Sequence, residues 1–147
     1  MSDKPFLDQL NIVVRDMEKS LAFYRRLGLS IPEKVWSNAS GAHHASASTD
    51  NSVAIDFDDP AFAQVWNRGW AGRNDLTGKV VVGFKMPSRE AVDIHYSDLT
   101  AAGYVGLQSP YDAFWGARYA IIEDPDGIAV GLMSPIDPAR KTPPTAA

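Results

Sequence analysis

Cysteine is absent from the 147 residues of this chain. Its absence excludes disulfide bonds, thiolate metal ligands and a cysteine nucleophile, and it is compatible with a reducing cytoplasm. Long apolar runs are also missing. No stretch approaches the roughly 20 apolar residues of a membrane span, and the opening MSDKPFLDQL contains no apolar signal-peptide core. We therefore expect a soluble, unprocessed, cytoplasmic protein that makes no membrane contact.

Blocks of basic residues are the third absence. The chain has 14 Lys and Arg against 18 Asp and Glu, a formal net charge of -4. Nucleic acid is therefore not expected as a partner, because phosphate backbones would be repelled, whereas a cationic ligand is modestly favoured. A hydrophobic content of 45% with 22% charged residues is typical of one globular domain.

The apolar pattern at the start of the chain predicts a strand followed by a helix. Residues 7–14 alternate between two faces, as in a half-buried strand. Asp16 stands at the position of a helix N-cap and Gly28 at a C-terminal stop. Between them, apolar residues recur at helical spacing: Met17, Leu21, Tyr24 and Leu27.

The same succession recurs at residues 79–104, where Ser88 is the expected cap and Gly103 the stop. Residues 52–60, SVAIDFDDP, likewise match residues 127–135, GIAVGLMSP. Two such matches indicate an internal duplication, with chance similarity of two amphipathic segments as the alternative. The remaining expected strands cover residues 30–36, 43–48, 104–109 and 117–123, and the DPDG sequence at 124–127 predicts a turn.

These patterns predict an α+β fold over residues 1–137. A first module is expected at 6–60 and a second at 79–135, each in the order strand, helix and three strands. Residues 61–78 connect them, and Phe62, Val65, Trp66 and Gly69 suggest a short helix there. Residues 138–147 are expected to form a flexible tail.

Two segments in this order resemble the vicinal-oxygen-chelate superfamily, which includes glyoxalases, bleomycin resistance proteins and extradiol dioxygenases. They are VVRDMEKSLAFYRRLGL in the first half and WGARYAIIEDPDGIAVGL in the second. The resemblance covers about residues 6 to 135. It implies two βαβββ modules that form a curved mixed sheet around a cleft, often in a homodimer.

The resemblance also implies four positions at which enzymes of the superfamily hold a metal ion. Here they are occupied by Gln9, Asp56, Val81 and Gly131. Val81 and Gly131 have no donor group, whereas a catalytic divalent site usually takes three protein ligands. His43 and His44 are adjacent on an expected strand, so only one of them can enter the cleft. His95 is interpreted as a helix-surface histidine or a core histidine with satisfied hydrogen bonds. No metal and no cofactor is therefore expected.

Alternation predicts the residues that face the cleft. Gln9, Asn11, Asp56 and Asp58 are expected to share one face of the first half, and Val81, Gly83, Ala129, Gly131 and Met133 one face of the second. Aromatic residues gather in the loop before the last hairpin, where a planar ligand could stack, although core packing is the alternative for any tryptophan. Arg118 is expected either to clamp an anionic group or to form an internal ion pair. The expected ligand-binding residues are Gln9, Asn11, Trp36, Asp56, Tyr111, Phe114, Trp115, Arg118 and Met133.

Three functions are compatible with these residues. The first is a metal-free protein that binds an aromatic or partly cationic small molecule, as drug-sequestering proteins do. The second is a metal-dependent lyase or dioxygenase that would use Gln9, Asp56 and one of the tandem histidines, or a metal-independent isomerase. The third is a regulatory or interaction subunit whose cleft is filled by its own side chains. No Ser/His/Asp spacing, phosphate loop or HExxH motif supports another reaction class.

Overall fold

The computed structural model describes residues 9–39, 41–51, 53–67 and 78–144. The chain divides into two compact units, Met1–Arg73 and Asn74–Ala147. Each unit has its own mixed four-stranded sheet, so the predicted α+β class is confirmed. Among the described residues, no helix has the length and apolar composition that a membrane span requires.

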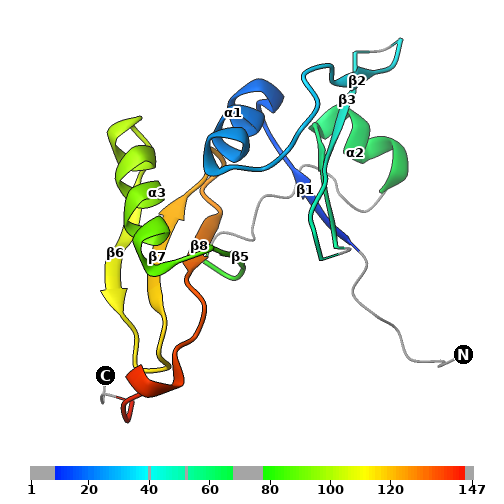
Figure 1. Ribbon diagram of the computed structural model, residues 1–147. Helices are drawn as coiled ribbons and strands as arrows, with labels where there is room; N and C mark the ends of the chain where they lie inside the picture. Colours follow the sequence, from blue (N-terminus) through cyan, green and yellow to red (C-terminus); the bar gives the residue numbers. More distant parts are fainter. Residues whose placement is uncertain (1–8, 40, 52, 68–77, 145–147) are drawn as a thin grey trace, which may run out of the picture. The chain divides into compact units, whose positions relative to one another are not determined.

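The first unit has the predicted order of strand, helix and three strands (Figure 1). Its sheet order is β1-β4-β3-β2, with β1 parallel to β4 and the other neighbours antiparallel. The elements are β1 (Gln9–Val13), α1 (Met17–Leu27), β2 (Trp36–Ser37), β3 (His43–Ala47), β4 (Ala54–Asp58) and the short helix α2 (Pro60–Trp66).

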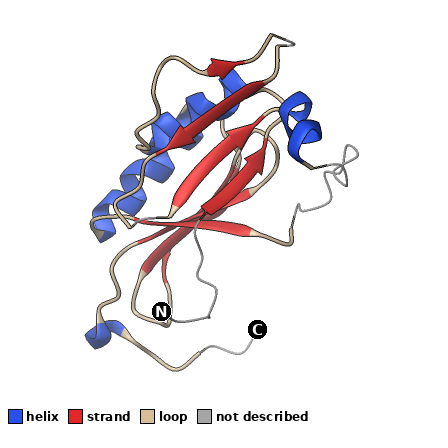
Figure 2. Ribbon diagram, turned by 90° about the vertical axis from the view of Figure 1, so that its right-hand side faces the viewer, coloured by secondary structure: helices blue, strands red, loops and turns tan. Residues whose placement is uncertain are grey.

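The second unit repeats this topology, with the sheet order β5-β8-β7-β6 and β5 parallel to β8 (Figure 1). Figure 2 draws the strands in red and the helices in blue. The DPDG turn joins its last two strands, and Asp124 Oδ1 accepts hydrogen bonds from the backbone of Asp126 and Ile128. The elements are β5 (Val81–Lys85), α3 (Arg89–Ala101), β6 (Gly106–Asp112), β7 (Arg118–Glu123), β8 (Ala129–Met133) and a 3-10 turn, η1 (Pro138–Arg140).

Each sheet buries one face beneath its long helix. In the first unit the ring of Tyr24 on α1 lies 4.9 Å from that of Phe57 on β4, and both side chains are fully buried. In the second unit α3 packs on β6, β7 and β8, and its Val92 and Leu99 are fully buried. Because side chains alternate along a strand, the residues between the buried ones occupy the opposite face, which is called the open face below.

The predicted helix ends are confirmed. The Asp16 carboxylate accepts the amide of Lys19, the Ser88 hydroxyl accepts that of Ala91, and Gly28 ends α1 with a φ of 120°. These ends depend on local chemistry, which a sequence displays directly.

Two predicted strands are corrected. Of residues 30–36, only Trp36 lies in a strand, the two-residue β2, and Ser30 forms an isolated bridge with Ser48. The Arg25 guanidinium, on the last turn of α1, donates to the carbonyls of Ile31 and Pro32. Those carbonyls therefore bind a side chain and not a neighbouring strand. Strand β6 begins and ends later than the predicted 104–109, which places Tyr111 in a strand and not in a loop.

The predicted connector and tail are only partly described. The expected short helix is α2, whereas Gly69, Trp70 and Gly72 lie outside the described residues. In the segment expected as a flexible tail, η1 is followed by Thr142, whose amide donates to the carbonyl of Phe114. The amide of Asp137, just before η1, donates to the carbonyl of Gly116. Residues 137–142 are therefore tied to the loop that carries Trp115.

Candidate functional site

Four aromatic rings meet on the open face of the second sheet and in its adjoining loop. Trp115 is their centre. Its ring packs edge to face with Phe114 at 5.1 Å, Tyr119 at 5.5 Å and Tyr111 at 6.4 Å between centroids. The Trp115 indole N–H also donates to the Met133 sulfur at 3.4 Å. We call Tyr111, Phe114, Trp115 and Tyr119 the aromatic cluster.

Strand register explains why these residues meet. Tyr119 on β7 is paired with Tyr111 on β6 and with Met133 on β8, so the three side chains stand on one face. A tight turn, in which the Gly116 amide donates to the carbonyl of Ala113, brings Trp115 back over them. Tyr111 and Phe114 are 38% and 41% exposed, so the cluster presents aromatic surface that a ligand can contact.

Beside this cluster, the small residues of the open face differ in the room that they leave. A Cβ added to Gly83 would have no described atom within 4 Å, so space is open there. A Cβ added to Gly131 would lie 2.8 Å from the Tyr119 hydroxyl oxygen. The space over Gly131 is therefore filled by Tyr119, a residue that the sequence interpretation did not include.

The four positions that the resemblance assigns to metal ligands do not fit a metal ion. Val81 and Gly131 offer no side-chain donor, and the Tyr119 hydroxyl covers Gly131. Within the described part of the chain, no group of three or more His, Cys, Asp or Glu side chains is arranged to hold a metal ion. Gln9 and Asp56 alone would leave a divalent ion with fewer protein ligands than catalytic sites provide.

Burial raises the pKa of the Tyr119 hydroxyl above its ordinary value of 10.0, and the neighbouring Tyr111 raises it further. The folded protein therefore holds this proton more tightly than the unfolded chain does. The resulting stabilisation is complete below the unfolded pKa and is lost as the pH rises through the folded pKa.

Above about pH 10, we expect the wild-type protein to lose stability more steeply than the Tyr119→Phe variant, which has no hydroxyl to ionise. The measurement is the free energy of urea unfolding at a series of pH values from about 8 to 11. Tyr111→Phe is the control and should keep most of the steep loss. Identical slopes in the wild type and Tyr119→Phe would contradict the assignment.

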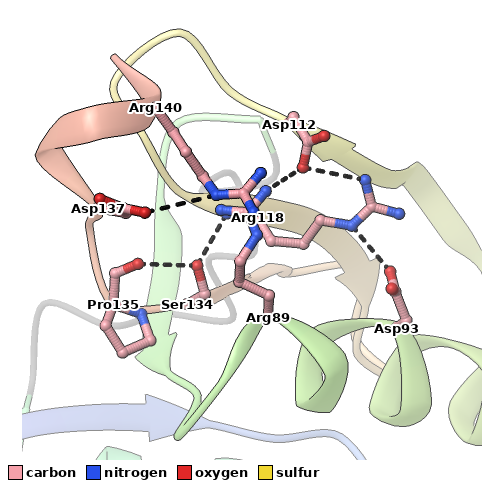
Figure 3. A network of polar contacts seen from close by, with 8 residues as sticks. All are labelled: Arg89, Asp93, Asp112, Arg118, Ser134, Pro135, Asp137 and Arg140. Atoms are coloured by element: carbon pink, nitrogen blue, oxygen red, sulfur yellow. Dashed lines mark hydrogen bonds and ion pairs between the residues drawn. The ribbon is translucent and has the colours of Figure 1, made fainter.

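Arg118 belongs to a different environment from the aromatic cluster. Its guanidinium donates to Asp93 on α3 at 3.0 Å and to Asp112 on β6 at 3.3 Å, and Asp112 also pairs with Arg89 (Figure 3). Burial lowers the pKa of Arg118, but the two carboxylates outweigh it and raise the pKa overall. Of the two predicted roles, the structure shows the internal ion pair, and it does not bring Arg118 together with the ligand-stacking residues.

The predicted residues of the first unit also share an open face. Asn11 is in register with Asp56, and Gln9 lies two residues before Asn11 on β1. Trp36 is paired with His44, which in turn is paired with Asp58. The Trp36 ring is 50% exposed and lies 5.2 Å from that of Phe62 on α2.

Sequence reasoning missed how His44 and Ser46 join this face. His44 Nδ1 lies within hydrogen-bond distance of Asp58 Oδ1, and Ser46 Oγ lies 3.3 Å from His44 Nε2. The Ser46 hydroxyl also donates to Asp56 at 2.7 Å. His44 and Ser46 are two residues apart, as are Asp56 and Asp58, so the sequence could indicate that each pair shares a face. It could not show the register between β3 and β4 that brings the two pairs together. We call Asn11, His44, Ser46, Asp56 and Asp58 the polar face.

A separate hollow of about 760 Å³ opens beside α1 in the first unit. It is lined by both signs of charge, including Arg15, Glu18 and Glu33, and by His43 and Asp59. His43 Nδ1 and Asp59 Oδ2 are 2.9 Å apart. The two adjacent histidines thus pair with two adjacent aspartates on opposite faces of the sheet, as the alternation predicted for His43 and His44.

Comparison with known proteins gives one family and many similar folds. Residues 6–132 match the model of the Glyoxalase/Bleomycin resistance protein/Dioxygenase superfamily. A superfamily enzyme from Burkholderia phytofirmans PsJN is 22% identical, with a TM-score of 0.72 over 87% of this chain and 97% of its own. A Nocardioides member is 21% identical, with a TM-score of 0.69 over 100% and 93%.

TnmS3, described as an antibiotic binding protein from Streptomyces sp. CB03234, is 19% identical, with a TM-score of 0.62 over 92% of this chain and 99% of its own. No curated protein matches the chain. At these identities the solved structures show the fold alone, whereas the family model spans most of the sequence. The chain belongs to the Glyoxalase/Bleomycin resistance protein/Dioxygenase superfamily.

Proposed function

We propose that this protein binds a planar aromatic small molecule without the help of a metal ion, as a drug-sequestering member of its superfamily would. The observation that carries the proposal is the position of Trp115, held edge to face by three rings on an open sheet face. Aromatic pairs contribute about 0.5–1.5 kcal/mol beyond the burial of their surface. The ring of a planar ligand, a fifth beside these four, can therefore gain affinity from several contacts at once.

Four further observations support this proposal. Gly83 leaves room beside the cluster, since no described atom lies within 4 Å of a Cβ placed there. Met133 adds a polarizable thioether that adapts to different ring systems. The net charge of -4 favours a ligand with a cationic group. A structural neighbour described as an antibiotic binding protein belongs to the same fold.

We expect Trp115→Ala to weaken binding of the planar cationic dye proflavine by about tenfold, on the order of 1–2 kcal/mol. The loss follows from removing the ring on which the dye would stack. Quenching of tryptophan emission during titration gives the dissociation constant in the wild type, and dye fluorescence gives it in the variant. Trp66→Ala is the matched control, because Trp66 is 46% exposed on α2 in the other unit.

Unchanged affinity in Trp115→Ala, or an equal loss in Trp66→Ala, would remove the aromatic cluster from the proposed site.

Elemental analysis of untagged protein addresses the alternative of a metal-dependent enzyme. Stoichiometric Fe, Zn, Ni or Mn would count against the proposal. Native mass spectrometry of freshly purified protein would identify a small molecule that copurifies with the chain.

A further inference from the structure

The polar face of the first unit contains a continuous line of hydrogen-bonding groups. It runs from Asp58 through His44 and Ser46 to Asp56, across the antiparallel strands β3 and β4. Each strand contributes two residues spaced by two, so all four side chains stand on the same face. Two carboxylates therefore flank one imidazole and one hydroxyl.

Asp58 fixes the orientation of the imidazole. Its side chain is only 1% exposed, and its Oδ1 is the partner of His44 Nδ1. When the imidazole is neutral, the Nδ1 proton is donated to Asp58, which leaves the lone pair on Nε2 directed away from it. The His44 side chain is 31% exposed, so Nε2 is available to a bound molecule.

The Asp58 carboxylate lies where it can balance the charge of a protonated His44 ring. A buried carboxylate is costly unless a cation or several donors compensate it. Among the described residues, the second oxygen of Asp58 and the side-chain oxygen of Asn11 are buried without any hydrogen-bond partner. Proton uptake by His44 would place a full positive charge beside the Asp58 carboxylate and strengthen the one hydrogen bond that Asp58 Oδ1 makes with the ring.

Ser46 can serve both protonation states of His44. Its hydroxyl donates to Asp56 at 2.7 Å, and its oxygen is 3.3 Å from Nε2. A protonated ring can donate from Nε2 to this oxygen while Ser46 keeps its bond to Asp56. When the ring is neutral with its proton on Nδ1, Nε2 and the Ser46 oxygen are both acceptors, because the Ser46 proton is donated to Asp56. No hydrogen bond then joins them, and the Nε2 lone pair is left for a hydroxyl group of a ligand.

Two aromatic side chains, Phe62 and Trp36, lie close to this imidazole. The Phe62 ring lies 5.5 Å from the His44 ring and 5.2 Å from the Trp36 ring. Trp36 is half exposed, so a planar molecule can contact it. The place where a proton can be accepted is thus also a place where a ring can pack.

We propose that the polar face is a proton-accepting site for an aromatic ligand with an acidic hydroxyl group, a phenol or enol. On binding, the O–H bond of the ligand breaks and an Nε2–H bond forms on His44. The products are the ligand oxyanion and an imidazolium, whose charge is balanced by Asp58. The proposal depends only on the first unit and does not rest on the aromatic cluster or on Trp115.

The chromogenic phenol 4-nitrophenol tests this transfer, because its oxyanion has a visible absorption band that the neutral form lacks. The experiment uses the full chain at a pH near the pKa of the free phenol. That pH lies above the ordinary histidine pKa of about 6.5, so a large part of the probe is protonated while an ordinary imidazole can still accept a proton. Adding wild-type protein should produce a saturable gain of the oxyanion band. 4-Nitroanisole, in which the hydroxyl is capped, should show no such gain.

His44→Asn is the decisive variant. The asparagine amide can still donate to Asp58 from the position of Nδ1, whereas no acceptor remains at the position of Nε2. The gain in the oxyanion band should fall at least tenfold. His43→Asn is the matched control, since it makes the same change in the neighbouring histidine, which lies beside Asp59 on the opposite face of the same strand. It should retain the gain.

Absence of any gain in the wild type, or an equal gain in His44→Asn, would overturn the proposal. If His44→Asn does not fold, two-bond proton–nitrogen NMR of the wild-type ring provides a second test. His44 should be in the Nδ1–H form in the free protein and should become doubly protonated with 4-nitrophenol. An Nε2–H form that stays unchanged would equally overturn the proposal. The Trp115→Ala variant should keep the full gain, which separates this outcome from the dye-binding test.

Discussion

Replacing Phe57 by alanine is expected to lower the free energy of unfolding by about 3–5 kcal/mol, the usual cost of removing a fully buried phenylalanine. Phe57 is 0% exposed, and its ring lies 4.9 Å from that of Tyr24. Truncation would leave a cavity between β4 and α1 that the surrounding helix and sheet can close only in part. Urea unfolding followed by circular dichroism measures the loss.

This variant also tests which face of β4 is buried. Asp56 and Asp58 alternate with Phe57, so a register slip of one residue would bury both carboxylates against α1 and expose the phenylalanine. Val65→Ala is the control, because Val65 is 67% exposed on α2 and its loss should stay within about 0.5 kcal/mol. A loss below about 1 kcal/mol in Phe57→Ala would contradict the assignment of the polar face.

Periodicity and caps predicted the repeated architecture because they act within a few residues. Asp16 and Ser88 each cap the helix that follows, and the left-handed Gly28 ends α1. The strand predicted at residues 30–36 failed because a side chain from outside that segment decides the structure there. The carbonyls of Ile31 and Pro32 are taken by the Arg25 side chain, which no strand pattern reveals.

The candidate site shows the same division. Alternation grouped Gln9 with Asn11 and Asp56 with Asp58, because side chains on one strand repeat every second residue. It did not show that Tyr119 would cover Gly131, nor that His44 would stand opposite Asp58. Both depend on the register between strands, which is set by the whole sheet and its turns. Contacts between side chains on neighbouring strands are therefore the part of the site that one sequence cannot predict.

Gly116 joins the loop of the aromatic cluster to the segment that follows β8. Its φ is 94°, a left-handed backbone conformation that residues other than glycine rarely adopt. A Cβ at this position would lie 2.4 Å from the backbone oxygen of Asp137. Gly103 in the same unit has a φ of 100°, but a Cβ on it would have no described atom within 4 Å. Alanine at Gly103 would therefore meet only the cost of the left-handed backbone, whereas alanine at Gly116 would meet that cost and a steric clash as well.

Gly103→Ala is expected to cost about 1–2 kcal/mol through its conformation alone. Gly116→Ala should cost about 1–3 kcal/mol more, because a backbone atom cannot move aside as the end of a side chain can. Urea unfolding gives both losses. Hydrogen exchange at the amides of Asp137 and Thr142 should accelerate only in Gly116→Ala, since these amides donate to the carbonyls of Gly116 and Phe114.

Equal losses in the two variants would show that the contact between Gly116 and Asp137 does not constrain the loop. If the expected difference is found, Gly116→Ala should also weaken proflavine binding, because Trp115 precedes Gly116 and its ring position depends on this turn. The residues after β8 would then act on ligand binding without touching the ligand. Their hydrogen bonds would hold the tryptophan at the geometry that its three neighbouring rings require.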